Sequence, residues 1–342
     1  MEEERKISFF LEQIPQPAFL VREDRIQYLN QAAAAWMLAP GQAFSPLIST
    51  GTGEYADFQG GQICLTLAIG STCHSAVITR MEDGDVVILE SQEDCEEFRS
   101  MALVSMELRR PLMQAISSAQ SRPSDAKLNQ SLMQMLRLVS NMADISRYST
   151  STRMETRDVD AFLLELFDKA QALTGSHIHL SFEGMKQPVF SQIDPEQLER
   201  AVYNILSNCI KFLPQDGWIH ASLKRCGRML HLTIEDSGSG IAEDIRANLF
   251  HRYLRQPCIE DSRYGLGLGL AIVRRAAANH GGTLLIGSGK NGGTKITMTM
   301  AIRQEERPQL HSPVFRPDYT GGWDHALVEL SDCLPSEYYQ EL

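Results

Sequence analysis

Residues 194–212 read DPEQLERAVYNILSNCIKF, and this stretch decides the fold of the second half of the chain. Asp194 can cap a helix, and Pro195 suits the first helical position. Gln197 stands where it completes a capping box, so a helix is predicted to begin here and to run to about Phe212.

The predicted helix carries polar residues on one face. Asn204, Asn208 and Lys211 are four and three positions apart, so they share that face. An amide oxygen such as that of Asn208 is a suitable hard ligand for Mg²⁺, and a lysine suits phosphate. The apolar residues of another face are Leu198, Val202, Ile205 and Cys209. Taken alone, the pattern also fits an ordinary amphipathic helix.

A second cluster, Asp236-Ser-Gly238-Ser-Gly240, follows a strand in which alternate residues over 230–234 are apolar. Asp236 continues the inward parity of that strand. A buried carboxylate needs a donor, and the amino group of adenine is one. Gly238 and Gly240 would let the backbone approach a flat ligand. A tight turn with a capping aspartate is the alternative for this motif alone.

A third cluster, Gly265-Leu-Gly267-Leu-Gly269-Leu, leads into a predicted helix over 271–279, whose N-terminus can present N–H groups to phosphate. It is not the dinucleotide fingerprint, because no strand immediately precedes it. Gly289-Lys290 is not a P-loop, because the other residues of that motif are missing.

Together and in this order, these clusters resemble the catalytic domain of sensor histidine kinases, within the gyrase-like GHKL ATPases. Residues 204–212 resemble the N box of the family, and residues 236–240 its first glycine box. Residues 250–255, which begin with Phe250, resemble its F box. The glycines of 265–269 resemble its second glycine box, and the whole resemblance covers about residues 96–303.

The resemblance implies an α/β sandwich of the Bergerat type that binds ATP with Mg²⁺. By it, Asn208 would hold Mg²⁺, Asn204 and Lys211 would face the phosphates, and Asp236 would read adenine. Residues 254–264 would form a lid. The other residues implied in nucleotide binding are Gly238, Gly240, Phe250, Gly265, Gly267 and Gly269.

The pattern breaks at the phosphoacceptor. Residues 106–112 read MELRRPL, where the family has a box resembling His-Glu-Leu-Arg-Thr-Pro-Leu. Met106 therefore stands in the place of the histidine, and a thioether cannot accept a phosphoryl group. Glu107, the presumed general base, remains as a vestigial or trans-acting group. Arg110 replaces the threonine.

The position of Met106 on its helix points it away from the apolar stripe, as an exposed acceptor would point. It is a relic, a tolerated surface methionine, or part of a partner-binding surface with Met113.

The chain is predicted to be a multidomain α+β protein. Residues 1–95 resemble a PAS sensor domain, with an unrelated small α+β domain as the alternative. Residues 96–152 predict a helical hairpin whose heptad-like stripe favours a dimeric four-helix bundle, or else packing onto the other domains. Residues 153–303 are the ATP-binding domain. Residues 304–342 form an acidic tail whose aromatic residues indicate docking.

The composition of the chain argues against several classes of function. The 32 basic and 43 acidic residues give a net charge of −11, which disfavours nucleic acid and anionic membranes as partners. No apolar run is long enough to span a bilayer, and the seven cysteines include no Cys-x-x-Cys pair. We therefore expect a cytoplasmic protein with reduced thiols.

The leading hypothesis is an ATP-binding signalling protein that cannot autophosphorylate at position 106. It would act as a homodimer, or as a heterodimer with an intact histidine kinase, and a response regulator is a further candidate partner. One alternative is a kinase acting in trans on a partner histidine or on Ser or Thr. The other is a non-catalytic interaction module.

Overall fold

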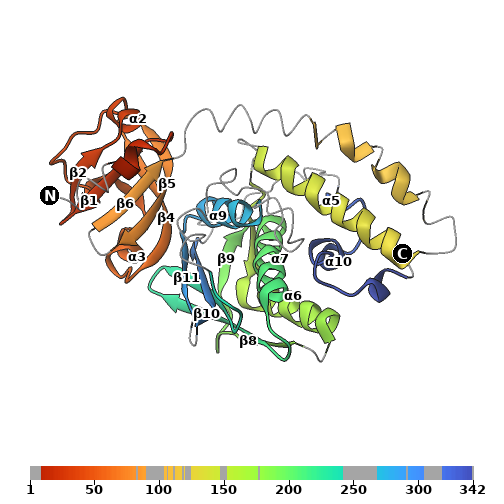
Figure 1. Cartoon of the computed structure of the whole chain (residues 1–342). Helices are drawn as coiled ribbons and strands as arrows, with labels where there is room; N and C mark the ends of the chain where they lie inside the picture. Colours follow the sequence, from red (N-terminus) through yellow and green to blue (C-terminus); the bar gives the residue numbers. More distant parts are fainter. Residues whose placement is uncertain are drawn as a thin grey trace.

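The structure, a computed structural model, describes most of the chain (Figure 1). The described residues are 9–81, 84–89, 104–105, 107–110, 112–117, 119, 125–146, 152–175, 178–241, 268–289, 292–303 and 318–340. Four of the predicted site residues lie outside them, namely Met106, Phe250, Gly265 and Gly267. The helix predicted near 242–253 and the lid predicted at 254–264 also lie outside them.

One eleven-stranded sheet forms the framework, in the order β2-β1-β6-β5-β4-β12-β13-β11-β10-β8, with β3 paired to β4. Its strands are β1 (Ala18–Arg22), β2 (Arg25–Leu29), β3 (Ile48–Thr50), β4 (Gly61–Ile69), β5 (Thr72–Met81), β6 (Gly84–Leu89), β8 (His179–Glu183), β10 (Trp218–Cys226), β11 (Met229–Asp236), β12 (Leu284–Ser288) and β13 (Thr294–Ala301). A separate two-stranded sheet pairs β7 (Glu155–Asp158) with β9 (Phe190–Ile193).

The N-terminal sequence predicts a helix over 30–37 and strands over 18–21, 26–29, 62–69, 74–79 and 85–89. The structure confirms these strands as β1, β2, β4, β5 and β6 and adds elements that the sequence did not indicate. These are η1 (Ser45–Leu47), β3 and α3 (Thr52–Ala56). The helix predicted over 30–37 is shorter than expected and forms only α2 (Gln31–Ala34). It cannot continue through Met37, because that residue adopts a left-handed backbone with φ of 54°.

The two halves of the sheet join through backbone pairing between β4 and β12. Cys64 lies opposite Leu284, and Gln62 lies opposite Ile286. Gly61, with φ of 88°, allows this approach, because a Cβ there would collide with the carbonyl oxygen of Ile286. The N-terminal and C-terminal strands therefore share one hydrogen-bonded ladder.

Helices α6 (Val159–Thr174), α7 (Pro195–Phe212) and α9 (Gly269–Asn279) pack with the C-terminal strands (Figure 1). The predicted start and end of α7 are confirmed, and the carboxylate of Asp194 accepts from the N–H of Gln197 at 3.2 Å. The capping box differs from the expected one. The Gln197 amide donates to the Asp194 carboxylate, while the N–H of Asp194 donates to His280 Nε2 at 3.0 Å.

Helix α5 (Ala126–Ser146) carries the heptad-like apolar stripe that the sequence predicts for the hairpin. The described residues of 104–119, which precede it in the predicted hairpin, are also helical. The stripe is divided in the structure. Leu132 and Val139 are buried in the core of the chain, whereas Leu128 and Met135 are 49% and 51% exposed. Packing onto the rest of the chain therefore accounts for part of the stripe only. Among the described residues, no helix is both long and apolar enough to cross a membrane.

The C-terminal segment 318–340 contains α10 (His325–Glu329) and η4 (Ser336–Tyr339). Figure 1 shows α10 lying among α5, α6 and α7, and contacts join it to all three helices. Tyr319 and Tyr339 are buried, so the expectation that aromatic residues of the tail dock is confirmed.

We expect acid to destabilise the fold through His280. Its Nε2 accepts from Asp194, its Nδ1 contacts the carbonyl oxygen of Ala276 at 2.7 Å, and burial lowers the pKa of its imidazole. The unfolded chain therefore binds this proton more readily, and stability contributed by the neutral ring falls as pH drops below about 6.5. Urea unfolding at several pH values should show this fall in the wild type and a shallower one in His280→Gln. A parallel pH dependence in both proteins would contradict it.

Candidate functional site

Helix α7 brings predicted site residues from three segments together. Gly269, at the start of α9, lies so close to Asn204 that a Cβ there would be 2.9 Å from the side-chain oxygen. Asp236 ends β11 beside the last turn of α7. A Cβ on Gly238 would be 2.9 Å from both the Asp236 carboxylate and the carbonyl oxygen of Phe212. The described residues of the first and second glycine boxes therefore approach the helix that carries the N box, one at Phe212 and the other at Asn204.

Asp236 is a buried and fixed acceptor. The parity predicted for β11 is confirmed, because its side chains alternate in burial up to Asp236, which is 4% exposed. Its Oδ1 accepts from the N–H of Gly238 at 2.8 Å and of Thr294 at 3.1 Å. Burial and this carboxylate raise the pKa of the Cys209 thiol well above its ordinary value. Two backbone donors thus orient the side chain predicted to read adenine.

Glycines allow backbone segments to close around Asp236. Gly240 has φ of 70°, and a Cβ on it would meet the carbonyl oxygen of Gly292. A Cβ on Gly293 would meet the carbonyl oxygen of Asp236 itself. The requirement for glycine at these positions therefore arises from close backbone contacts within the protein. These contacts bring the two backbone segments close to Asp236.

Asn204 is buried and fully engaged. Its Nδ2 donates to the carbonyl oxygen of Arg200 at 2.8 Å and lies 3.5 Å from Glu329 Oε2. Its Oδ1 accepts from Arg137 Nη2 at 3.2 Å. Asn208 lies one turn further along the same face and is partly buried. The amide predicted to face phosphate is therefore held by the guanidinium of Arg137, the carboxylate of Glu329 and a backbone carbonyl of its own helix.

Glu329, in α10, is the centre of a buried ion network and has no exposed side-chain surface. Its Oε1 lies 3.0 Å from Arg200 Nε on α7, and its Oε2 lies 3.3 Å from Arg137 Nε on α5. Arg200 also donates to Asn141 at 2.7 Å and pairs with Asp144, both on α5. Two buried guanidinium groups therefore share one buried carboxylate of the C-terminal segment, and each has a second, partly exposed acid as a further partner.

Lys211 faces the same segment. Its Nζ lies 2.7 Å from Asp332 Oδ2, and the same oxygen accepts from Arg137 Nη1 at 2.6 Å. Asp332 is 28% exposed, so this pair lies at the edge of the network. The lysine predicted to face phosphate thus has a carboxylate as its partner.

Sequence reasoning missed four charged residues of this site. Arg200 could have been found, because it precedes Asn204 by four positions and so shares its helical face. Arg137 stands between apolar stripe residues of α5 without a motif, and Glu329 and Asp332 lie in a tail that matches no pattern. Only the fold brings these three to α7.

The first predicted helix is also tied to the tail. Arg109 Nη2 donates to the carbonyl oxygens of Tyr319 at 2.5 Å and of Asp318 at 3.0 Å. Glu107 lies in the same helical stretch with an exposed side chain. The presumed general base is therefore accessible, while its helix is held by the C-terminal segment.

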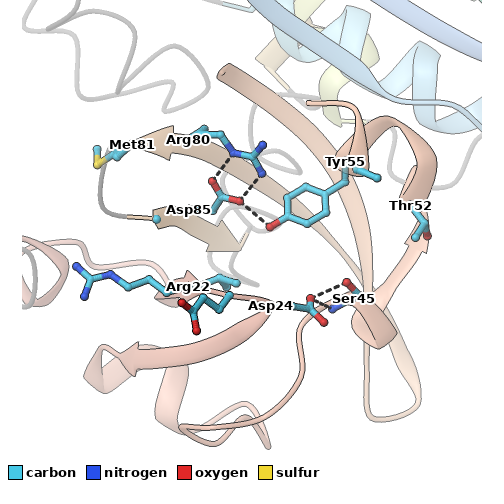
Figure 2. A pocket seen from close by; sticks show the side chains of 12 residues that line it. Arg22, Asp24, Ser45, Thr52, Tyr55, Arg80, Met81 and Asp85 are labelled. Atoms are coloured by element: carbon cyan, nitrogen blue, oxygen red, sulfur yellow. Dashed lines mark hydrogen bonds and ion pairs between the residues drawn. The ribbon is translucent and has the colours of Figure 1, made fainter. Parts of the chain in front are cut away.

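A hollow of about 450 Å³ lies in the N-terminal part of the chain (Figure 2). Its polar groups satisfy one another. Arg80 and Asp85 form a two-pronged ion pair, Tyr55 donates to Asp85 at 2.6 Å, and Ser45 donates to Asp24. Burial and the Asp85 bond raise the pKa of Tyr55. Among the described residues, no group of three or more His, Cys, Asp or Glu could hold a metal ion.

The site around α7 has the chemistry that a magnesium nucleotide needs. Asn208 supplies an amide oxygen, Lys211 a cation, and Asp236 a buried acceptor for an amino group. The absence of a side chain at Gly269 leaves the start of α9 against Asn204, where N–H groups of a helix start favour an anion. These residues fit ATP with Mg²⁺.

Comparison with known proteins agrees with this geometry. Residues 193–304 match the family described as histidine kinase-, DNA gyrase B- and HSP90-like ATPase. The chain is 24% identical over 235 residues to the sensor histidine kinase WalK of Bacillus subtilis, which covers 64% of this chain and 38% of WalK. It is 29% identical over 185 residues to the sensor-like histidine kinase SenX3 of Mycolicibacterium smegmatis, covering 51% of this chain and 46% of SenX3.

Among solved structures, a mycobacterial sensor histidine kinase, MprB, is 27% identical and is matched over 99% of its chain and 44% of this one, with a TM-score of 0.35. The present chain spans less than half the length of the two curated relatives.

We expect Glu329→Gln to destabilise the protein by about 1.5–3 kcal/mol, because it removes the fully buried carboxylate that Arg137 and Arg200 share and leaves them only the partly exposed Asp332 and Asp144 as charged partners. Urea unfolding followed by circular dichroism measures this loss. Lys169→Gln is the control, because it breaks an exposed pair with Asp324 and should cost at most about 1 kcal/mol. Equal losses in the two variants would show that the buried network does not stabilise the fold.

Proposed function

Because the chain is a member of the sensor histidine kinase family and carries its ATPase domain, we propose that it binds ATP with Mg²⁺ in signal transduction without phosphorylating itself at position 106. The observation that carries the proposal is the grouping of Asn204, Asp236 and Gly269 around α7. Two motifs that are distant in sequence meet the helix that carries the third, as a shared nucleotide site would require.

The residues of this cradle take distinct roles in the proposal. Asp236 accepts a hydrogen bond from the purine amino group, and Asn208 holds Mg²⁺ through its amide oxygen. Lys211 and Asn204 contact the phosphates, and the start of α9 at Gly269 adds backbone donors. ATP would supply the transferable phosphoryl group, and Mg²⁺ would neutralise part of its charge. Glu107 would take a proton only from a partner group, since Met106 offers none.

We propose that the chain acts through a second protein. Its ATPase cradle is present, but its acceptor is absent, so phosphoryl transfer would require a histidine of a heterodimer partner or a Ser or Thr of another protein. A homodimer would instead act by changing the conformation of a partner kinase or of a response regulator. Residues 1–95, 96–152, 153–303 and 304–342 form the proposed sensor, hairpin, ATPase and tail units.

An exposed apolar surface supports the proposed dimer. Val104 and Leu108 on the first helix and Leu128, Met135 and Leu138 on α5 are all exposed. Such side chains on neighbouring hairpin helices mark a contact surface for another protein. The hairpin is therefore the proposed dimerisation unit, although part of its stripe packs within the chain.

We expect Asp236→Asn to weaken Mg·ATP binding at least about tenfold, because a charge-assisted acceptor for the amino group is lost. The asparagine keeps an oxygen for the Gly238 and Thr294 donors, so the fold should persist. Calorimetric titration measures the affinity. Asp168→Asn, an exposed change of the same type on α6, should bind like the wild type. Failure of the wild type to bind at millimolar concentration would favour a non-catalytic interaction module.

We expect γ-labelled ATP to leave the wild-type chain unlabelled, and Met106→His to acquire an acid-labile label. Met106→Gln, which is polar but cannot accept the group in this way, is the control. Acid-labile labelling of the wild type would contradict the assignment of Met106. Acid-stable label on an added protein would instead indicate a kinase for Ser or Thr.

A further inference from the structure

We propose that the C-terminal segment 318–340 is an internal occupant of the phosphate face of α7, and that Mg·ATP reaches its full affinity only when Asp332 leaves Lys211. This inference rests on the proposed nucleotide site and assigns a regulator to it. The segment is part of the same chain, so it competes whenever the site is empty of nucleotide.

Charge is the first argument. The N-box residues predicted to meet phosphate, Asn204 and Lys211, both meet carboxylates of this segment instead. Asp332 lies 2.7 Å from Lys211 Nζ, and Glu329 lies 3.5 Å from Asn204 Nδ2. A phosphate that reached these groups would lie close to both carboxylates, and like charges at such distances repel. The segment therefore stands where the anionic part of the nucleotide is expected.

The second argument is that the segment is docked rather than merely nearby. Side-chain amides of α5 donate to its backbone, Asn129 to Tyr339 O at 2.9 Å and Gln130 to Leu334 O at 2.7 Å. His325 bridges Glu199 of α7 at 2.7 Å and Asp318 at 3.1 Å. Its fully or almost fully buried apolar side chains are Ala326, Val328, Leu330, Leu334 and Tyr339. This burial holds the carboxylates at α7 without a ligand.

The third argument separates an exchangeable contact from a permanent one. Glu329 has no exposed surface and neutralises two buried arginines, so its removal would be costly. Asp332 is 28% exposed and binds through one oxygen to Lys211 and Arg137, so it can move to solvent. Displacement of Asp332 would release Lys211 and the Nη1 group of Arg137, while Glu329 and Asn204 keep their contacts with the rest of the Arg137 guanidinium. Arg137 of α5 would then be available to the same anion as Lys211 of α7.

The test compares Mg·ATP and adenosine binding to the full chain in the wild type, Asp332→Asn and Glu337→Gln. We expect Asp332→Asn to bind Mg·ATP at least about threefold more tightly, since one anionic competitor is lost. Adenosine, which has no phosphates, should bind all three proteins equally. Glu337 is an exposed acid of the same segment, and its variant should match the wild type with both ligands.

Unchanged or weaker Mg·ATP binding by Asp332→Asn overturns the inference, and so does an equal gain for adenosine. If neither ligand binds the wild type or the variant, the proposed nucleotide site itself fails. Hydrogen exchange of the wild type gives a readout that needs no variant. Amides of 325–339 should exchange faster with Mg·ATP than with adenosine, and equal exchange with both ligands would count against displacement of the segment.

Discussion

The carboxylate of Glu329 is the interaction on which the arrangement of the helices depends. It lies out of solvent between Arg137 of α5 and Arg200 of α7, and so joins the hairpin, the ATPase domain and the C-terminal segment at one point. Each arginine would be costly to bury alone, because a guanidinium loses its hydration there. The three segments can therefore pack closely only in each other's presence, and the buried apolar side chains of α10 add to that packing.

This dependence brings the proposed nucleotide site and the C-terminal segment to one helix. One face of α7 carries Asn204, Asn208 and Lys211, which suit a magnesium nucleotide, and the same face receives the two acids of the C-terminal segment. Helix α5 contributes Arg137 to that face as well. Binding or release of a nucleotide at this face would thus act directly on the hairpin through Arg137 of α5.

Local sequence patterns were sufficient for α7, for the parity of β11 and for most of the strands. Capping residues and apolar spacing act within a few positions, so Asp194 and Asp236 could be placed correctly. The prediction that the Gln197 side chain accepts from the N–H of Asp194 in a capping box is wrong. That N–H donates instead to the imidazole of His280, which is distant in sequence. The role of the tail could not be predicted for the same reason. Glu329 and Arg137 are 192 positions apart in the sequence. The periodic patterns of single helices and strands give no information about contacts between residues that are so distant.

The shared ladder of β4 and β12 gives the molecule a mechanical property that separate lobes would lack. Cys64 of β4 also contacts Arg274 of α9, the helix whose first residue, Gly269, lies against Asn204. If a flexible linker joined the two halves of the chain, the N-terminal lobe could rotate freely. A movement of that lobe would then not reach the C-terminal strands. A continuous sheet of hydrogen-bonded strands would instead transmit a twist of the N-terminal lobe to β12 and β13, in parallel with any movement of the hairpin helices.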